Sequence, residues 1–196
     1  MQGVGHDWHL AATELACRRG DRVLFRGLSL DLAAGQALHV TGANGIGKSS
    51  LLRLLAGLLQ PYAGTVDRRG AIGLADERPA LDPHLPLGQA LGFWAALDGA
   101  ATRASEGLGL GGLLDVPVRY LSTGQRKRAA LARLIGQQAP IWLLDEPLNG
   151  LDRSAVAAVE ALAAHHCATG GICVVASHQS FALSGKTELA LAEFAA

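Results

Sequence analysis

The chain reads ALHVTGANGIGKSSLLRLLAGL from residue 37 to residue 58, and this segment indicates the fold class. A short apolar run leads into a glycine-rich loop at 42–50, and a leucine-rich run with helical spacing follows. The loop matches the pattern G-x-x-x-x-G-K-[ST], with both glycines, Lys48 and Ser49 in the required places. An ordinary glycine-rich turn would not need the lysine, so the segment predicts a phosphate-binding loop between a strand and a helix.

Each part of this loop has a chemical task in nucleotide binding. Glycines let backbone N–H groups turn inward around phosphate oxygens, and the start of the helix adds its dipole. Lys48 is expected to reach the outer phosphates of ATP, and the Ser49 hydroxyl is expected to ligate Mg²⁺. The predicted ATP-binding residues of the loop are Gly42, Ala43, Asn44, Gly45, Ile46, Gly47, Lys48, Ser49 and Ser50.

Two carboxylates follow a second apolar run, IWLLDEP at 141–147. An aspartate at the end of such a strand, here Asp145, can hold Mg²⁺ opposite the loop serine. Glu146 would then face the attacking water as general base. A pair of solvated loop acids is the alternative, but four apolar residues leading directly into the pair favour a site. Asp152, in NGLD, is interpreted either as a helix N-cap or as a site residue.

A histidine, His178, closes a third apolar run, ICVVASH at 172–178. A single histidine is more often structural than catalytic. Ligands of parallel α/β sheets bind at the carboxyl ends of strands, however, and a histidine there can hydrogen-bond a γ-phosphate. We therefore predict that His178 belongs to the catalytic site.

Strand-like and helical segments alternate along the chain, which predicts an α/β fold with a mostly parallel sheet. The predicted strands are a run near Val23, the segments 37–42, 71–75, 141–145 and 172–177, and a short strand in the final GKTELALAEFAA. The predicted helices are 48–58, 88–97, 126–137 and 153–168.

Composition narrows the classes of function. The 196 residues, 49% of them hydrophobic, are expected to form one domain, 1–196. Lys plus Arg equals Asp plus Glu, 17 against 17, which argues against a nucleic-acid partner. We expect no secretory leader, and no apolar run reaches the roughly 18–20 residues that span a bilayer. Because no run could span a bilayer, work at a membrane would require a membrane partner. Three cysteines without CxxC spacing suit a reducing cytosol.

The segment YLSTGQRKRAALARL, residues 120–134, raises a question of charge. Arg126, Lys127 and Arg128 stand at the start of the predicted helix, where the helix dipole disfavours cations. We therefore expect a bound anion near this end of the helix.

Together these motifs resemble those of the ABC (ATP-binding cassette) ATPases, whose signature segment is similar to LSTGQ at 121–125. The resemblance covers nearly the whole chain, through GANGIGKSS, LSTGQ, LLDEP, NGLD and the histidine of ICVVASH, in that order. It implies a P-loop NTPase (RecA-like) core with a mostly parallel sheet and an antiparallel β edge, formed by residues 1–82 and 125–196. Residues 83–124 would form an inserted small α-helical subdomain.

The same resemblance implies that two copies join head to tail as a homodimer. ATP would lie between the phosphate loop of one copy and the signature segment of the other, with Mg²⁺ as cofactor. The signature residues acting in the partner's site would be Ser122, Thr123, Gly124 and Gln125. Glu146 would be the base, His178 the phosphate sensor and Asp152 part of the D-loop. The anion near LSTGQRKR would then belong to ATP held by the second copy.

A closer resemblance is to the ATPases of cytochrome c biogenesis haem exporters, through RGDRVLFRGLSLDLAAGQALHV, VPVRYLSTGQRKRAALARL and GGICVVASHQ. In that subfamily an Arg-Gly pair, here Arg19-Gly20, stands where most relatives stack an aromatic ring on adenine. A guanidinium can also stack on a base, and a solvated turn residue is the equal alternative. The resemblance implies integral membrane permease subunits as partners and a peripheral place on the cytoplasmic side of the inner membrane. It links ATP hydrolysis to haem export or to release of a haem-loaded chaperone.

Glu77 departs from the family pattern, which has a glutamine here that contacts Mg²⁺ or its water. A carboxylate can still bind the metal, but its negative charge beside the γ-phosphate would slow hydrolysis. Glu77 therefore keeps a regulatory nucleotide-binding module with little hydrolysis open. Two other functions stay open independently of Glu77: a non-transport ABC protein acting on ribosomes or DNA, and the ATPase of another small bacterial exporter.

Two further clusters are interpreted as structural. The run of His165, His166 and Cys167 lacks a fourth ligand and is expected on a solvated helix face, so no metal or haem site is assigned to it. Phe93 and Trp94 are expected to fill the small core of the insertion, with a groove for a membrane subunit's helix as the alternative.

Overall fold

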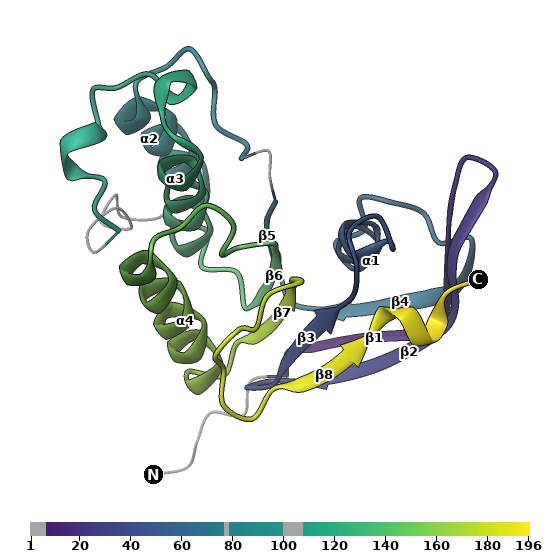
Figure 1. Ribbon diagram of the computed structural model, residues 1–196. Helices are drawn as coiled ribbons and strands as arrows, with labels where there is room; N and C mark the ends of the chain where they lie inside the picture. Colours follow the sequence, from purple (N-terminus) through teal and green to yellow (C-terminus); the bar gives the residue numbers. More distant parts are fainter. Residues whose placement is uncertain (1–6, 77–78, 100–107) are drawn as a thin grey trace, which may run out of the picture.

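The computed structural model describes residues 7–76, 79–99 and 108–196, which form two sheets of different character (Figure 1). Within these ranges, five strands form a sheet in which every neighbouring pair is parallel. Their order across the sheet is β5 (Ile72–Ala75), β6 (Ile141–Asp145), β7 (Ile172–Ala176), β3 (Ala37–Thr41) and β8 (Thr187–Ala190). The predicted α/β fold with a parallel sheet is confirmed, including the short strand near the C-terminus.

The second sheet is antiparallel and has the order β2 (Arg22–Ala33), β1 (His9–Arg19) and β4 (Ala63–Arg69). The sequence pattern indicated only the run near Val23, because register shifts interrupt β1 and most side chains of β4 are exposed. One shift centres on Glu14, whose φ is 50°. Gly64 passes so close that a Cβ there would lie 2.4 Å from the Glu14 carbonyl oxygen, so only glycine fits.

Helix α1 (Lys48–Leu55) lies between the two sheets (Figure 1). It contacts β1 on one side and β6 and β7 on the other. Its leucines at 51, 52, 54 and 55 are fully buried, and Arg53 reaches outward to pair with Asp76 at 3.3 Å. Burial of each leucine contributes about 1.5–3 kcal/mol, so this packing holds the start of the helix firmly where the phosphate loop ends.

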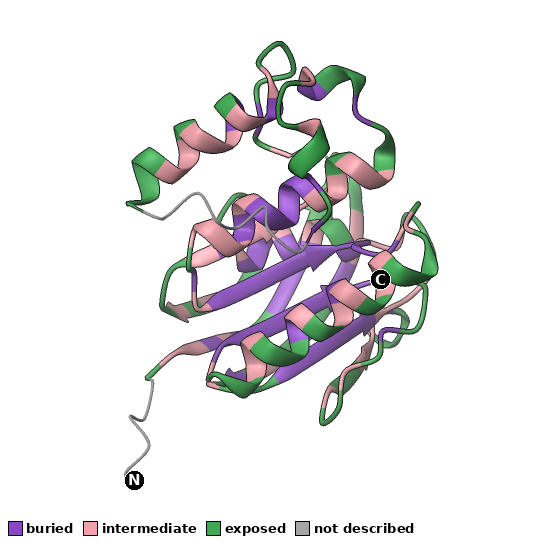
Figure 2. Cartoon of the chain, turned by 90° about the vertical axis from the view of Figure 1, so that its left-hand side faces the viewer, coloured by how far each residue is buried: buried purple, intermediate pink, exposed green. Residues whose placement is uncertain are grey.

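The other face of the parallel sheet is covered by α3 (Thr123–Gly136) and α4 (Arg153–Ala168), and α2 (Leu87–Asp98) packs against α3. Every residue of β6 and β7 is buried, as their continuous apolar runs predicted. Figure 2 shows the central strands buried along their length, while the helices in front of them are exposed on their outer sides. No helix in the described ranges combines the length and the apolar character needed to cross a bilayer.

The predicted helix at 153–168 is confirmed to the residue, but the one predicted at 126–137 begins earlier, at Thr123. A capping box explains the earlier start: Ser122 Oγ accepts from the Gln125 N–H at 3.2 Å, and Gln125 Oε1 accepts from the Ser122 N–H at 2.8 Å. Because α3 begins three residues earlier, the cations of LSTGQRKR lie in its second turn. The division of the chain at residues 83 and 124 stays a prediction.

Candidate functional site

The parallel register brings three strand ends to one level of the sheet. Val40 of β3 pairs with Ala176 of β7, and Ala176 pairs with Asp145 of β6. The phosphate loop, the acidic pair and His178 each follow one of these strands, so they converge at the carboxyl edge. Sequence reasoning predicted this convergence because all three motifs end apolar strand-like runs.

The phosphate loop has the backbone geometry that its glycines permit. Gly42, Gly45 and Gly47 have φ of 147°, 80° and 119°, a region that residues with a side chain rarely adopt. Gly47 precedes α1 and supplies no side-chain cap, so the first helical N–H groups are open to a ligand. The loop lines a cavity of about 320 Å³, which Leu24, Glu146 and Asn149 also line.

Lys48 is buried and lies between the loop and the acidic pair. Its Nζ donates to the carbonyl oxygens of Gly42 at 2.8 Å and Ala43 at 3.3 Å. The same ammonium is 3.2 Å from Glu146 Oε1. The Lys48 ammonium is therefore held against the loop carbonyls. The Glu146 carboxylate occupies the side of this ammonium that a phosphate would contact.

Glu146 is buried, and cationic or polar groups surround its carboxylate. Ser177 Oγ donates to Glu146 Oε2 at 3.4 Å, and His178 Nδ1 lies 2.9 Å from the same oxygen. Burial by itself raises the pKa of Glu146, but Lys48 and then His178 outweigh burial, and the net pKa is lowered. Glu146 is therefore ionised at neutral pH, which is the form a general base requires.

The contact with Glu146 also determines how His178 can act. A carboxylate only accepts hydrogen bonds, so the ring nitrogen facing it, Nδ1, carries a proton. The other nitrogen, Nε2, can donate to a phosphate oxygen only when the ring is doubly protonated. His178 is 43% exposed, so it can reach a ligand above the strand ends.

Asp145 and Ser49 form a donor set that fits Mg²⁺. Asp145 is buried at the end of β6, and Ser49 is exposed at the start of α1 and lines the phosphate-loop cavity. A hydroxyl and a carboxylate are hard oxygen ligands, and protein sites for Mg²⁺ usually supply only one or two before phosphate completes the shell. Glu77, the third predicted ligand, lies outside the described residues.

The signature residues stand apart from their own phosphate loop. Ser122 is the N-cap of α3, and Thr123, Gly124 and Gln125 form its first turn. None of the four lines the cavity of the phosphate loop in the described part of the same chain. Gly124 has a local reason to be glycine as well, since a Cβ there would lie 2.8 Å from the Gly150 carbonyl oxygen.

Asp152 is the N-cap of α4, as one of its two sequence interpretations had it. Its Oδ1 accepts from the Ala155 N–H at 2.8 Å and from Ser154 Oγ at 2.7 Å. These hydrogen bonds lower the pKa of Asp152 and keep the cap ionised.

Arg19 ends β1 in an exposed turn and is absent from the described lining of the phosphate-loop cavity, so adenine stacking stays a prediction.

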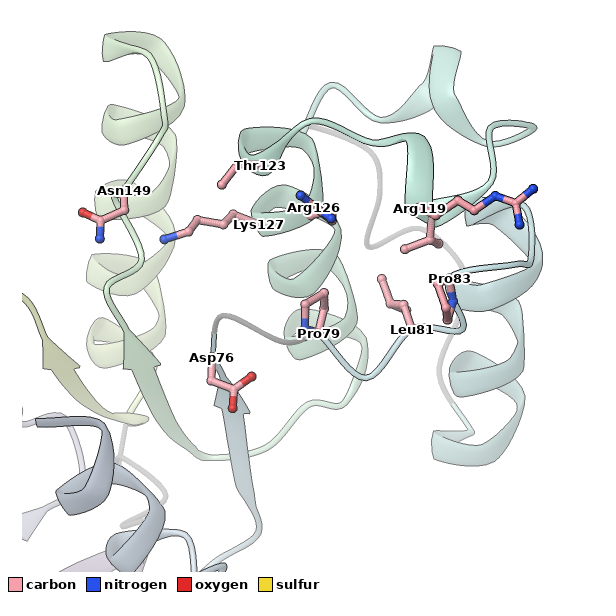
Figure 3. A pocket seen from close by; sticks show the side chains of 10 residues that line it. Asp76, Pro79, Leu81, Pro83, Arg119, Thr123, Arg126, Lys127 and Asn149 are labelled. Carbon is pink, nitrogen blue, oxygen red and sulfur yellow. The ribbon is translucent and has the colours of Figure 1, made fainter. Parts of the chain in front are cut away.

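Two of the three cations of the signature helix have partners within the chain, and a bound anion near this end of the helix stays a prediction. Lys127 Nζ donates to the Glu146 carbonyl oxygen, and Arg128 Nη1 donates to the Leu108 carbonyl oxygen at 2.9 Å. Arg126 is exposed and lines, with Lys127, a cavity of about 600 Å³ beside α3 (Figure 3). The sequence analysis did not predict the contact between Lys127 and Glu146. The only related signal in the sequence was the run of three cations at 126–128.

Two structural interpretations also change. His166 is not on a solvated face: its ring stacks on Trp142 with 3.9 Å between ring centroids, and Nε2 donates to the Pro140 carbonyl oxygen at 3.1 Å.

Phe93 does not fill the core of the insertion, because it is 61% exposed. Trp94 is partly buried, and its Nε1 donates to the Ala80 carbonyl oxygen. No group of three or more metal-ligating side chains occurs in the described residues.

Comparison with known proteins agrees with this geometry. Residues 25–149 match the family model described as ABC transporter, a match that includes the phosphate loop, LSTGQ and the acidic pair. The chain belongs to the ABC transporter family. Its fold and its activity are accordingly those of an ABC-type ATPase, and ATP is its nucleotide.

Two curated relatives extend the match over nearly the whole chain. The cytochrome c biogenesis ATP-binding export protein CcmA of Novosphingobium aromaticivorans is 64% identical, over 94% of this chain and 96% of the relative. The CcmA protein of Zymomonas mobilis is 53% identical, over 95% of this chain and 86% of the relative. Among solved structures, an ATP-binding subunit of an ABC transporter superposes with a TM-score of 0.77 at 21% identity, covering 86% of this chain and 79% of that one. At that identity the structure supports the fold alone.

Proposed function

We propose that this ATPase is the nucleotide-hydrolysing subunit of a cytochrome c biogenesis export complex. The observation that carries the proposal is the buried Glu146 carboxylate, held between Lys48 and His178 beside the phosphate loop. The names of the two CcmA relatives support the biological setting.

In this proposal the phosphate loop binds the triphosphate with its backbone N–H groups and with Lys48. The lysine already points at the loop mouth, so it exchanges its contact with Glu146 Oε1 for a contact with phosphate oxygen. Mg²⁺, held by Ser49 and Asp145, would offset the charge of the phosphates. Glu77 would be its third neighbour, and its carboxylate would slow the reaction relative to a glutamine.

Glu146 then acts on the attacking water. Freed from Lys48, the carboxylate accepts the proton as the water oxygen bonds to the γ-phosphorus and the bond to ADP breaks. His178 Nδ1 keeps the second carboxylate oxygen in place at 2.9 Å, and its Nε2 would be able to donate to phosphate when both ring nitrogens carry a proton. Before nucleotide binds, the lowered pKa of Glu146, due first to Lys48 and then to His178, keeps the carboxylate ionised at neutral pH.

The signature segment would complete the site of a second copy. The N–H groups of Thr123 and Gly124 lie outside the capping box at the start of α3, a helix terminus that favours anions. None of the four signature residues lines the cavity of the phosphate loop in the described part of the same chain, which suits a head-to-tail homodimer. The dimer would bind integral membrane permease subunits on the cytoplasmic side of the inner membrane, and Asp152 would lie in the D-loop near the dimer interface.

The test of the catalytic proposal is Glu146→Gln in the purified full chain. The amide cannot take the proton, so we expect kcat to fall by about 100-fold or more while Mg·ATP binding by calorimetry is retained or tightened. Turnover at the wild-type rate would refute Glu146 as the base.

The biological setting is tested separately, by affinity capture from detergent-solubilised membranes. We expect the chain to capture cytochrome c biogenesis membrane subunits, and capture of a different exporter's permease would refute this setting.

A further inference from the structure

Lys127 makes a contact that the proposed reaction scheme does not yet use. It lies in the second turn of α3, and its Nζ donates to the main-chain oxygen of Glu146, 19 residues away in sequence. Figure 3 shows the side chain reaching from α3 toward the segment that carries Asn149. A cationic side chain from the signature helix is thus bonded to the backbone of the candidate base.

The backbone at Glu146 needs such support. Its φ of 45° lies in the left-handed region, which residues with a side chain rarely adopt. Its N–H donates to the Ala176 carbonyl oxygen at 2.8 Å, and its own carbonyl accepts the Asn149 N–H at 3.3 Å. Lys127 adds a charged donor to that carbonyl, and charge-assisted hydrogen bonds are the stronger kind. The direction of this peptide decides where the carboxylate points.

The same helix touches the chain just after Glu146 at a second place. A Cβ on Gly124 would lie 2.8 Å from the Gly150 carbonyl oxygen, and a Cβ on Gly150 would lie 3.5 Å from Thr123 Cγ2. The signature turn and the Lys127 turn of α3 therefore both rest on the segment 146–150. A movement of one turn of a rigid helix moves the other.

We propose that Lys127 is a positioning residue: it holds the strained Glu146 peptide to α3, so that the base is aligned only when the signature helix is in place. The inference rests on the proposed role of Glu146 and extends it. In a head-to-tail dimer, the helix that contacts nucleotide in one site would then set the base of the other site.

The experiment compares Lys127→Met, Lys127→Arg and Arg126→Met in the full chain. Lys127→Met should lower kcat by about 10- to 100-fold, because misplaced catalytic groups cost that much, while the Kd for Mg·ATP changes less than about twofold. Lys127→Arg should recover most of the loss, since a guanidinium can donate to the same carbonyl. Arg126→Met removes an equal charge from the same helical turn without touching Glu146, and it should cost much less.

A double variant separates this inference from the function on which it rests. In the Glu146→Gln background, Lys127→Met should produce no further loss of kcat, because residues acting through one group are not additive. If Glu146→Gln is inactive but Lys127→Met keeps wild-type kcat, or if Arg126→Met loses as much, the inference is overturned and the proposed function stands. If Glu146→Gln turns over normally, the proposed function itself fails. Thermal unfolding of each variant identifies one that loses activity by failing to fold, and Lys127→Arg then decides: a folded Lys127→Arg chain with no recovered kcat overturns the inference.

Discussion

Lys48 and Glu146 form an ion pair within the chain. The ammonium has three acceptors within 3.3 Å: two loop carbonyls and the carboxylate. This arrangement keeps a charge pair satisfied in a buried place, where an unpaired charge would be costly. In the proposed scheme, binding of a triphosphate by Lys48 would release Glu146, which would link the candidate base to the nucleotide through a single ammonium group.

The Lys48–Glu146 pair predicts a pH dependence of stability. The pKa of Glu146 is lowered in the folded chain, so its ionised form adds stability above the usual carboxyl pKa of about 4.3, and that stability is lost as pH falls through the lower folded value. Glu146→Gln has no such group. We expect the wild-type chain to lose more unfolding free energy than the variant as pH falls from 5 toward about 3, measured by urea unfolding. Parallel acid limbs for the two chains would contradict the lowered pKa.

At the scale of elements, the antiparallel sheet depends on one close crossing. Gly64 of β4 has φ of 81° and lies against the carbonyl oxygens of Thr13 and Glu14, and the bulge at Glu14 leaves no space for a side chain. The crossing joins β1 to β4, and β1 also packs on α1. A substitution that displaces β1 at this crossing would therefore also displace α1, and with it the phosphate loop that precedes α1.

The prediction for this crossing is that Gly64→Ala destabilises the fold by about 2 kcal/mol or more, since it combines left-handed strain with backbone overlap. Gly111→Ala is the matched control: nothing lies within 4 Å of a Cβ there, and its φ is not in the left-handed range. That change should stay within about 0.5 kcal/mol of wild type in denaturant unfolding. Equal effects for the two variants would show that the crossing is not close-packed.

At the scale of the whole molecule, the proposed head-to-tail dimer would build each active site from two chains. The phosphate loop and the signature turn of one chain do not share a cavity among the described residues. A head-to-tail dimer would pair them across two copies, which gives a twofold-symmetric assembly with two composite sites. The composite nature of the site can be tested without a structure of the dimer.

The test mixes two inactive variants of the full chain. Lys48→Met disables the phosphate loop, and Ser122→Asp keeps the N-cap of α3 but places a negative charge toward the partner's phosphates. Each variant alone should be inactive. In a mixed dimer one site combines the intact loop of one chain with the intact signature of the other, so an equal mixture should recover about a quarter of wild-type activity. No recovery, or turnover by a strict monomer, would refute the composite site.

Much of the site was predictable from sequence because its chemistry is local. The phosphate loop needs glycines where φ is positive, and Gly42, Gly45 and Gly47 occupy those places. Asp145 and His178 follow apolar runs, and the rule that parallel strands end at one edge brings them together without further information. The family resemblance added the antiparallel edge, which composition and spacing did not indicate.

The remaining features needed the tertiary structure, because they join residues that no local pattern relates. Lys127 and Glu146 meet only when α3 packs on the parallel sheet, so a run of three cations could not reveal which one contacts Glu146. His166 enters the space beside Trp142 because α4 lies against the ends of two strands. Local backbone preference places single motifs, whereas packing of the helices on the sheet decides which motifs touch, and in this protein that packing joins the signature helix to the backbone of Glu146.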